Sequence, residues 1–248
     1  MLKDWEDLPE GLKNNQVLSY YKILKSKKAH LALKRLFDIV MSLILILLLI
    51  PLFIIIAVLI KMDSKGPIMY RQVRVTQYGR KFSIFKFRTM INNADKIGAK
   101  VTTMNDTRIT RLGLKLRKFR LDEIPQLFNI VIGDMSFVGT RPEVTKYVQH
   151  YTDDMMATLL LPAGVTSEAS IHYKDEEELL ADAHNVDEVY INNILPEKMV
   201  YNLKSIESFT FLGEIKTMLK TVYAVISSEK DSKSMNGNKR IDNSKENV

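Results

Sequence analysis

The sequence contains no cysteine and only four histidines among its 248 residues. Without cysteine, the chain has no disulfide, no thiol nucleophile and no thiolate-bound metal. No two histidines have the i,i+4 spacing of a helical zinc site, so a histidine-rich metal centre is not expected. The chain also lacks a GxGxxG or Walker loop, and nucleotide binding by those standard motifs is therefore not supported.

Basic and acidic residues are unevenly spread along the chain, whose formal net charge is +7. Residues 61–120 contain 16 Lys and Arg against 3 Asp and Glu, whereas residues 151–199 contain 2 against 11. The basic region predicts an anionic partner, such as a phosphorylated substrate, an anionic lipid or a nucleic acid. Because no nucleic-acid-binding motif is recognisable, we expect no nucleic acid. The acidic stretch is interpreted as a solvated face or a counter-surface rather than a second site.

One long apolar segment, residues 39–60, carries no charge in 22 residues. As a helix it would reach roughly 33 Å, enough to cross the hydrocarbon core of a bilayer. Pro51 interrupts its hydrogen bonding, and both flanks are basic, whereas a spanning helix carries that excess on one side only. A re-entrant helix over residues 34–62, broken at Pro51, satisfies both observations. A spanning helix that contains proline is the alternative.

The rest of the chain predicts a mainly α-helical α+β fold. Strands at residues 68–75 and 81–87, around Gln77-Tyr78-Gly79, predict a short β-hairpin. Surface helices are expected at residues 109–119, 123–131, 141–160, 175–183 and 211–227, and a polar loop at 92–105.

The two ends of the chain differ from its middle in composition. Residues 1–33 are a basic amphipathic leader, which either lies on a lipid headgroup surface or is a flexible tail. Residues 228–248 are polar and are expected to be disordered. The remaining soluble part, residues 63–227, is therefore predicted to be the functional domain.

The first candidate for chemistry is the pair Asp122-Glu123, followed by Pro125. Proline is tolerated in a first helical turn, so the helix is expected to begin near Asp122 and to place both carboxylates at its positive end. Six basic residues directly precede the pair, and these charges also favour the ionised form. An ionised aspartate among cations suits a metal ligand or a nucleophile toward phosphate. An ordinary helix cap is the alternative.

Two further segments carry cations in positions suited to phosphate. Lys86 and Arg88 alternate with Phe85 and Phe87, which predicts both cations on one strand face, where they could clamp a diphosphate. Arg141 ends a loop of small residues, 133–142, whose backbone donors suit phosphate recognition. A solvated strand face and a structural turn are the respective alternatives.

The order and spacing of these segments resemble those of the bacterial sugar transferase family, the small monotopic phosphoglycosyl transferases that act on polyprenyl phosphate. The resemblance extends from about residue 34 to residue 222. It rests on Lys34-Arg35-Leu36-Phe37-Asp38, Ile60-Lys61 through Gly66-Pro67, Gln72-Val73-Arg74, Phe85 to Met90, Arg108-Ile109-Thr110, Arg117-Lys118 through Asp122 to Leu127, and Gly133 to Gly139 through Arg141-Pro142.

The resemblance implies transfer of a phosphosugar from a nucleotide diphosphosugar, expected to be a UDP-sugar, to polyprenyl phosphate. The nucleoside monophosphate is released, and the reaction is the first membrane step of a cell-surface glycan such as an exopolysaccharide or capsule. It implies Asp122 as the nucleophile of a covalent intermediate, Glu123 as its partner and Mg²⁺ held at Asp122. The catalytic domain, residues 63–227, would be cytosolic, with its site at the cytoplasmic face of the cell membrane. The substrate-binding candidates are Lys86, Arg88, Arg108, Arg111, Arg117 and Arg141.

Four positions depart from the family pattern. Ile50 stands where the family usually has Ser before Pro, Thr140 replaces a proline, Ser167 falls where a glycine is usual, and Asn202 replaces an acidic residue. These changes put substrate identity in doubt more than the class of reaction. A membrane-anchored scaffold that has lost activity is therefore the alternative function, and a homodimer is left open.

Overall fold

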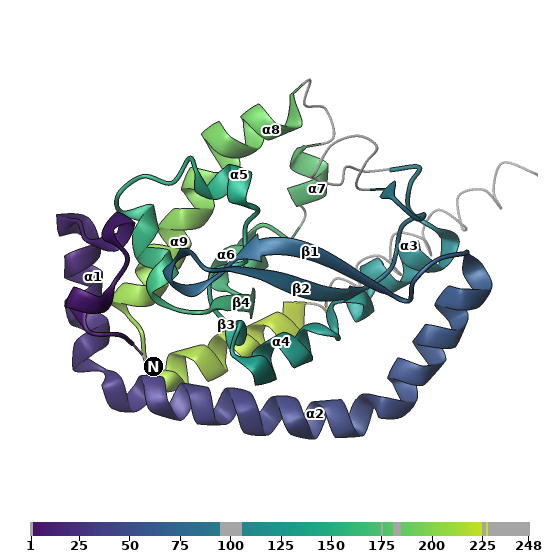
Figure 1. The fold of residues 1–248 in the computed structure, drawn as a ribbon, viewed down its shortest axis with the longest axis horizontal. Coiled ribbons are helices and arrows are strands. Elements are labelled where there is room, and N and C mark those ends of the chain that lie inside the picture. Colours follow the sequence, from purple (N-terminus) through teal and green to yellow (C-terminus); the bar gives the residue numbers. More distant parts are fainter. Residues whose placement is uncertain (1, 95–105, 175, 181–184, 225–226, 228–248) are drawn as a thin grey trace, which may run out of the picture.

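The computed structural model describes residues 2–94, 106–174, 176–180, 185–224 and 227. A long helix, α2 (Lys28–Asp63), lies beneath the rest of the molecule, and a hairpin of β1 (Met69–Val75) and β2 (Lys81–Phe87) crosses the middle (Figure 1). A second, parallel pair is formed by β3 (Met135–Val138) and β4 (Ala163–Thr166). Helices surround both pairs, which confirms the mainly helical α+β class.

The predicted hairpin is present with nearly the predicted bounds. Its strands are antiparallel, with Met69 opposite Phe87 and Val75 opposite Lys81. Tyr78 and Gly79 adopt positive φ angles of 61° and 75°, which turn the chain between the strands. Phe82 and Ile84, alternate residues of β2, are buried against α4 (Gln126–Ile132), and this packing sets the position of β2 relative to that helix.

The leader packs on the domain instead of trailing from it. It contains two short 3-10 turns, η1 (Trp5–Asp7) and η2 (Glu10–Leu12), and helix α1 (Asn15–Ser26), whose first turn is capped by the Asn14 side chain. Leu12, Val17 and Leu24 are fully buried in a cluster with Leu160. The flexible-tail interpretation is therefore wrong, and contact of this segment with lipid stays a prediction.

Helix α2 is continuous through Pro51, so the predicted break at this residue is wrong, and the helix bends in the part of its length that rises at the right of Figure 1. It buries polar residues at i, i+4 and i+8, namely Lys34, Asp38 and Ser42, against the domain. Its opposite face exposes aliphatic side chains, including Leu36, Leu47, Leu48, Ile54 and Val58. By length and composition α2 could cross a membrane, and only 11% of its most apolar window is buried.

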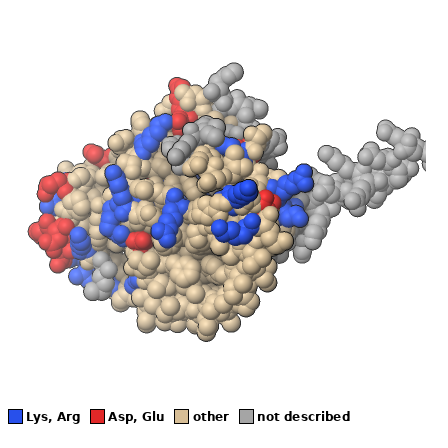
Figure 2. Space-filling model, turned by 45° about the vertical axis from the view of Figure 1, so that its right-hand side comes forward, with Lys and Arg blue, Asp and Glu red and all other residues tan. Residues whose placement is uncertain are grey.

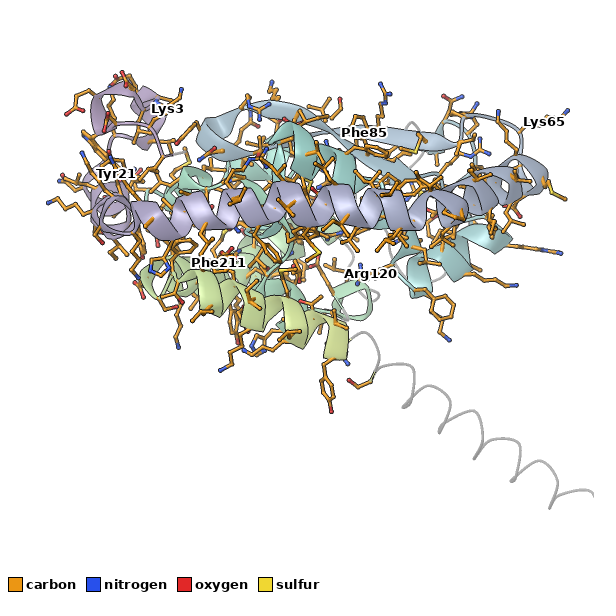
Figure 3. All side chains as sticks on the ribbon, turned by 90° about the horizontal axis from the view of Figure 1, so that it is seen from below. Lys3, Tyr21, Lys65, Phe85, Arg120 and Phe211 are labelled. Atoms are coloured by element: carbon orange, nitrogen blue, oxygen red, sulfur yellow. The ribbon has the colours of Figure 1, made fainter. Side chains whose placement is uncertain are left out.

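Polar contacts attach both ends of α2 to the same domain. Near its start, Lys34 Nζ donates to the Val138 carbonyl over 2.8 Å, and Arg35 Nη1 donates to the Ile130 carbonyl over 2.7 Å. At its end, Arg88 Nη2 donates to the Ser64 carbonyl over 2.6 Å. Figure 3, seen from below, shows α2 running across the domain between these points.

The other elements are short. They are α3 (Arg111–Lys118), η5 (Leu121–Glu123), α5 (Thr145–Val148), η6 (Met155–Leu160), α6 (Glu168–His172), α7 (Glu176–Leu179), α8 (Val186–Val189), the π-helical turn η7 (Tyr190–Ile194) and α9 (Leu195–Glu207), and residues 211–224 are helical. The predicted helices at 109–119 and 211–227 are thus largely present. Residues 95–105, 181–184 and 228–248 lie outside the described residues, so the predicted loop, part of one predicted helix and the tail are not assessed.

The single helix predicted at residues 141–160 is wrong. The chain instead forms α5 and η6, separated by an irregular segment. Pro142 has no N–H to donate, and the Glu143 carbonyl accepts a hydrogen bond from the Val75 amide, which keeps this stretch extended beside β1. Further on, the Thr152 hydroxyl donates to Asp154, a local bond that competes with helical pairing.

Candidate active site

Asp122 and Glu123 lie in η5, between α3 and α4, where the chain turns sharply. Arg120 adopts a left-handed conformation, with φ 55°, and this reversal ends the α3 segment. Helix α3 packs tightly on the main chain just after β2, where a Cβ at Gly113 would lie 2.0 Å from the Thr89 carbonyl oxygen. The helix after the pair begins at Gln126, which corrects the predicted start near Asp122.

Glu123 is held by two cations that come from distant parts of the chain. Its Oε1 lies 2.8 Å from Lys86 Nζ on β2 and 2.6 Å from Arg141 Nη2, ahead of α5. Burial opposes ionisation of this carboxyl, but Arg141 and Lys86 together hold the pKa of Glu123 well below its usual range. Glu123 is therefore a permanent carboxylate that fixes both cations.

Asp122 has a different environment, although it is adjacent in sequence and also buried. None of the described residues forms a hydrogen bond or an ion pair with the Asp122 carboxylate. Burial raises the pKa of Asp122, while the charge of Lys86 opposes that rise. The prediction that its surroundings favour ionisation is wrong for Asp122, because desolvation on burial outweighs the nearby cations in setting its pKa and the helix begins four residues later. The two carboxylates therefore have distinct chemical roles.

The structure brings together some of the predicted phosphate-binding residues and not others. Lys86 and Arg141 meet at Glu123, and the charge of Arg117 lowers the pKa of Asp122. Arg108 is bound to Asp106 over 2.5 Å, and Arg111 is exposed at the start of α3. Contact of any of these residues with substrate stays a prediction.

Arg88 lies apart from Lys86, so the predicted clamp on one strand face is not formed. β2 ends at Phe87, and the Arg88 guanidinium turns to the end of α2, where it donates to the carbonyls of Ser64 and Lys65. Arg88 is only 5% exposed. Its role in this structure is to close the last turn of α2.

Two residues of α4 were not identified from the sequence. The buried Asn129 side chain accepts from the Phe85 amide and donates to the Ser83 carbonyl, each over 2.9 Å, and thereby ties α4 to β2 beside Lys86. The Gln126 amide is buried, and both its nitrogen and its oxygen lack a partner in the described residues. A polar residue inside the apolar run 124–132 was the available signal.

The donor set at this site suits Mg²⁺ bound together with phosphate. The unpaired Asp122 carboxylate is an oxygen donor of the kind Mg²⁺ prefers, whereas both Glu123 oxygens face cations. No cluster of three or more metal-ligating side chains occurs within the described residues. Mg²⁺ commonly uses one or two carboxylates and completes its shell with water and substrate phosphates, so Asp122 alone fits that mode.

The four departures from the family pattern have local structural settings. The Thr140 carbonyl accepts from the Gly164 amide over 2.9 Å. Ile50 is exposed on α2. The Ser42 hydroxyl donates to the carbonyls of Asp38 and Ile39, which belong to the preceding turn of the same helix. Ser167 caps α6 by accepting from the Ser170 amide over 3.0 Å. Asn202 is buried in α9.

Basic side chains gather in a band on the face shown in Figure 2, above a lower surface that has few charges. That lower surface corresponds to the side on which α2 lies in Figure 1. The molecule therefore places cations next to an apolar surface, an arrangement suited to an anion at a membrane interface.

Comparison with known proteins gives the same assignment as the motifs. Residues 29–228 match the family model described as "Bacterial sugar transferase". The chain is 45% identical over 119 residues, 48% of its length, to the UDP-N-acetylgalactosamine-undecaprenyl-phosphate N-acetylgalactosaminephosphotransferase of Aeromonas hydrophila. It is 32% identical over 200 residues, 78% of its length, to the UDP-glucose:undecaprenyl-phosphate glucose-1-phosphate transferase of Klebsiella pneumoniae.

A shorter relative matches over most of its own length. The putative undecaprenyl-phosphate N-acetylgalactosaminyl 1-phosphate transferase of Bacillus subtilis (strain 168) is 35% identical over 140 residues, which are 56% of this chain and 78% of the relative. The chain spans 28% and 40% of the other two relatives. The fold is a mainly helical α+β domain with a basic site and one helix long and apolar enough to cross a membrane, and the chain belongs to the bacterial sugar transferase family.

Proposed function

We propose that this protein transfers a sugar phosphate from a nucleoside diphosphate sugar, a UDP-sugar, to polyprenyl phosphate through a covalent intermediate on Asp122. The observation that carries the proposal is the contrast at η5, where Asp122, which has no hydrogen-bond or ion-pair partner among the described residues, lies beside a Glu123 that two cations hold ionised. Relatives named as undecaprenyl-phosphate sugar phosphotransferases support the substrate class.

The reaction consists of two displacements at one phosphorus atom. In the first, an Asp122 oxygen attacks the phosphorus that bears the sugar, and the bond from that phosphorus to the oxygen shared with the second phosphate breaks. Nucleoside monophosphate leaves, and the sugar phosphate remains on Asp122. In the second, an oxygen of polyprenyl phosphate attacks the same phosphorus and the bond to Asp122 breaks, giving polyprenyl diphosphosugar and a free carboxylate.

Lys86 and Arg141 face the charge that develops on the phosphate oxygens. Glu123 holds both cations in place before substrate arrives, so little reorganisation is needed during the reaction. Because its pKa is low, Glu123 positions charge and does not donate a proton. Mg²⁺ held by Asp122 would neutralise phosphate charge and orient the leaving group.

We further propose that α2 enters the cytoplasmic leaflet of the cell membrane and that both its ends stay on the cytoplasmic side. Arg35, near the start of α2, donates to the domain at Ile130, and Arg88 of the same domain donates to Ser64 at the end of α2. A helix that is tied at each end to the same soluble unit cannot place these ends on opposite faces while the contacts persist. The aliphatic face of α2 then meets lipid, and the acceptor phosphate would lie close to Asp122.

Trapping of the intermediate tests the proposal. The detergent-purified protein is incubated with Mg²⁺ and each of a broad panel of UDP-sugars, without polyprenyl phosphate, and its intact mass is measured. One sugar should add the mass of its phosphate ester to a peptide that contains Asp122, and Asp122→Asn should show no addition. An adduct on another residue, or release of UMP with full turnover by Asp122→Asn, would contradict the mechanism.

A further inference from the structure

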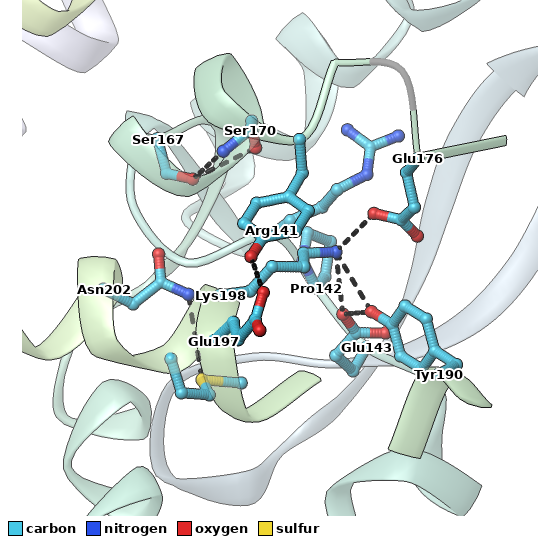
Figure 4. Close-up of polar contacts among 12 residues, drawn as sticks. Arg141, Pro142, Glu143, Ser167, Ser170, Glu176, Tyr190, Glu197, Lys198 and Asn202 are labelled. Atoms are coloured by element: carbon cyan, nitrogen blue, oxygen red, sulfur yellow. Dashed lines mark hydrogen bonds and ion pairs between the residues drawn. The ribbon is translucent and has the colours of Figure 1, made fainter. Parts of the chain in front are cut away.

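A buried polar cluster lies beside Arg141, away from Asp122. Lys198 of α9 is 4% exposed, and its Nζ lies 2.8 Å from Glu176 Oε2, 3.1 Å from the Tyr190 hydroxyl and 3.9 Å from Glu143 Oε1. The Tyr190 hydroxyl donates to the same Glu143 oxygen over 2.5 Å. Figure 4 shows Lys198 between the two glutamates, with Arg141 in the same view.

Most of this cluster comes from the acidic part of the chain. Glu176 lies in α7 and Tyr190 begins the π-helical turn η7, and both precede α9. The sequence predicted a solvated acidic surface for this part of the chain, but the side chains of Glu176 and Tyr190 point into the cluster. π-helical turns are rare and occur frequently at functional sites, and here the turn brings Tyr190 to Glu143.

The cluster adjoins the short segment that carries Arg141. Glu143 follows Arg141 by two residues, and its own carbonyl accepts from the Val75 amide over 2.9 Å. Arg74 Nη1 donates to the intervening Pro142 carbonyl over 3.1 Å. The main chain is thus fixed by β1 and the Glu143 side chain by Tyr190 and Lys198, which leaves the long Arg141 side chain as the adjustable part.

Arg141 has a choice of anionic partners. It binds Glu123 over 2.6 Å, and Glu176 and Glu143 are close enough to contribute to its raised pKa. Lys198 supplies the positive charge that occupies these two competing carboxylates. Without it, Glu176, whose side chain is 24% exposed, would be a partly buried, uncompensated anion near the Arg141 guanidinium, a costly state that a nearby cation relieves.

We propose that Lys198 is a positioning residue for the transferase reaction: by neutralising Glu176 and Glu143 it keeps Arg141 on Glu123, where it meets the donor phosphates. The inference rests on the proposed function, because Arg141 has a kinetic role only there. Glu176, Tyr190 and Lys198 are accordingly structural determinants of the active site and not merely parts of a solvated surface.

The experiment compares four full-length proteins in detergent: wild type, Lys198→Met, Glu176→Gln and the double variant. Nucleoside monophosphate release is measured with a UDP-sugar that the wild type uses. Lys198→Met should lower kcat at least about tenfold, because Arg141 turns to Glu176. Adding Glu176→Gln should restore kcat to within about threefold of wild type, since the competing charge is gone. Glu176→Gln alone should stay close to wild type.

A matched control removes another lysine that binds the same segment. Lys146 Nζ lies 2.6 Å from Asp187 Oδ2 of α8, but this pair is about half exposed. Lys146→Met should leave kcat unchanged, because exposed pairs contribute little and Asp187 does not compete for Arg141. Equal losses in Lys146→Met and Lys198→Met would overturn the specific role of Lys198.

The rescue separates positioning from packing. If adding Glu176→Gln fails to restore the kcat of Lys198→Met, Lys198 acts by packing and the proposal is wrong. A wild-type kcat in Lys198→Met also overturns the proposal. Should Lys198→Met fail to fold, the double variant decides, because it lacks the uncompensated charge: near-wild-type kcat supports the proposal and a tenfold loss contradicts it. Thermal unfolding of the four proteins reports the Lys198–Glu176 coupling even if no UDP-sugar is turned over, so failure of the proposed function is recognised separately.

Discussion

At the scale of single residues, the site depends on two neighbouring carboxyl groups with opposite titration behaviour. Asp122 and Glu123 could be identified from the sequence as a pair among cations, but their different roles could not. Lys86 and Arg141 are 37 and 18 residues away from Glu123 along the chain. Only the folded arrangement decides that both cations bind Glu123 and that Asp122 has no such partner in the part of the chain that the structure describes.

The raised pKa of Asp122 predicts how kcat/KM falls at low pH. A protonated carboxyl is not a nucleophile, so kcat/KM should fall as the pH drops through a value above 3.8, the ordinary pKa of this group. Arg117→Met should move this limb to higher pH, since Arg117 lowers the pKa of Asp122. Lys115→Met, on the exposed side of α3, is the control. A limb that stays in place or moves to lower pH in Arg117→Met would contradict the assignment.

Lys86 and Arg88 should respond differently to the same substitution. Lys86→Met should lower kcat about a hundredfold, because in the proposed mechanism Lys86 stabilises the charge on the reacting phosphate. Arg88→Met should retain kcat but lower Tm, because it removes charged hydrogen bonds at the end of α2, worth about 1.5–3 kcal/mol each. Turnover assays and thermal unfolding on both variants make the comparison. Loss of kcat in Arg88→Met at temperatures where it is folded would instead support direct contact with substrate.

At the scale of elements, local patterns predicted structure best where the stabilising contacts are local. The hairpin formed as predicted because alternation and a turn at residues 77–79 agree. The helix predicted at 141–160 failed because a distant strand, β1, provides the hydrogen bonds to residues 142–143. No periodic pattern in the sequence indicated that the side chains of Tyr190 and Lys198 are buried.

Docking of α3 on β2 should depend on one glycine. Gly113→Ala would place a methyl group 2.0 Å from the Thr89 carbonyl, a main-chain atom that cannot move aside easily. Overpacking of this kind costs about 1–3 kcal/mol, so Tm should fall, and kcat should fall with it because α3 leads into η5. Leu114→Ala, which is exposed on the same helix, should change Tm little. An unchanged Tm in Gly113→Ala would contradict the tight contact.

The ends of α2 should be accessible from the same side of the membrane. The absence of native cysteine allows Leu33→Cys and Lys65→Cys to be labelled singly in intact cells with a membrane-impermeant thiol reagent. Both should be protected until the membrane is opened. Gly66 is unsuitable, because its φ is 133° and a Cβ would meet Arg88 Nη1 at 1.9 Å. Labelling of one position and protection of the other would establish a spanning helix.

At the scale of the whole molecule, basic residues and apolar residues occupy different surfaces, as their separation along the sequence already indicated. Basic side chains form a band above a lower surface that has few charges, on the side where α2 lies (Figures 1 and 2). The family assignment covers residues 29–228. What composition could not indicate is that α2 is tied to the domain at both ends, since those contacts join residues far apart in the chain.

The most direct test of the central claim is the identity of the released nucleotide. Purified protein is given Mg²⁺, polyprenyl phosphate and a panel of UDP-sugars, with Asp122→Asn in parallel. The account predicts UMP with at least one sugar and at least about a thousandfold less UMP with Asp122→Asn. Release of UDP would show direct glycosyl transfer and contradict the mechanism. No nucleotide across a broad panel would favour the inactive scaffold.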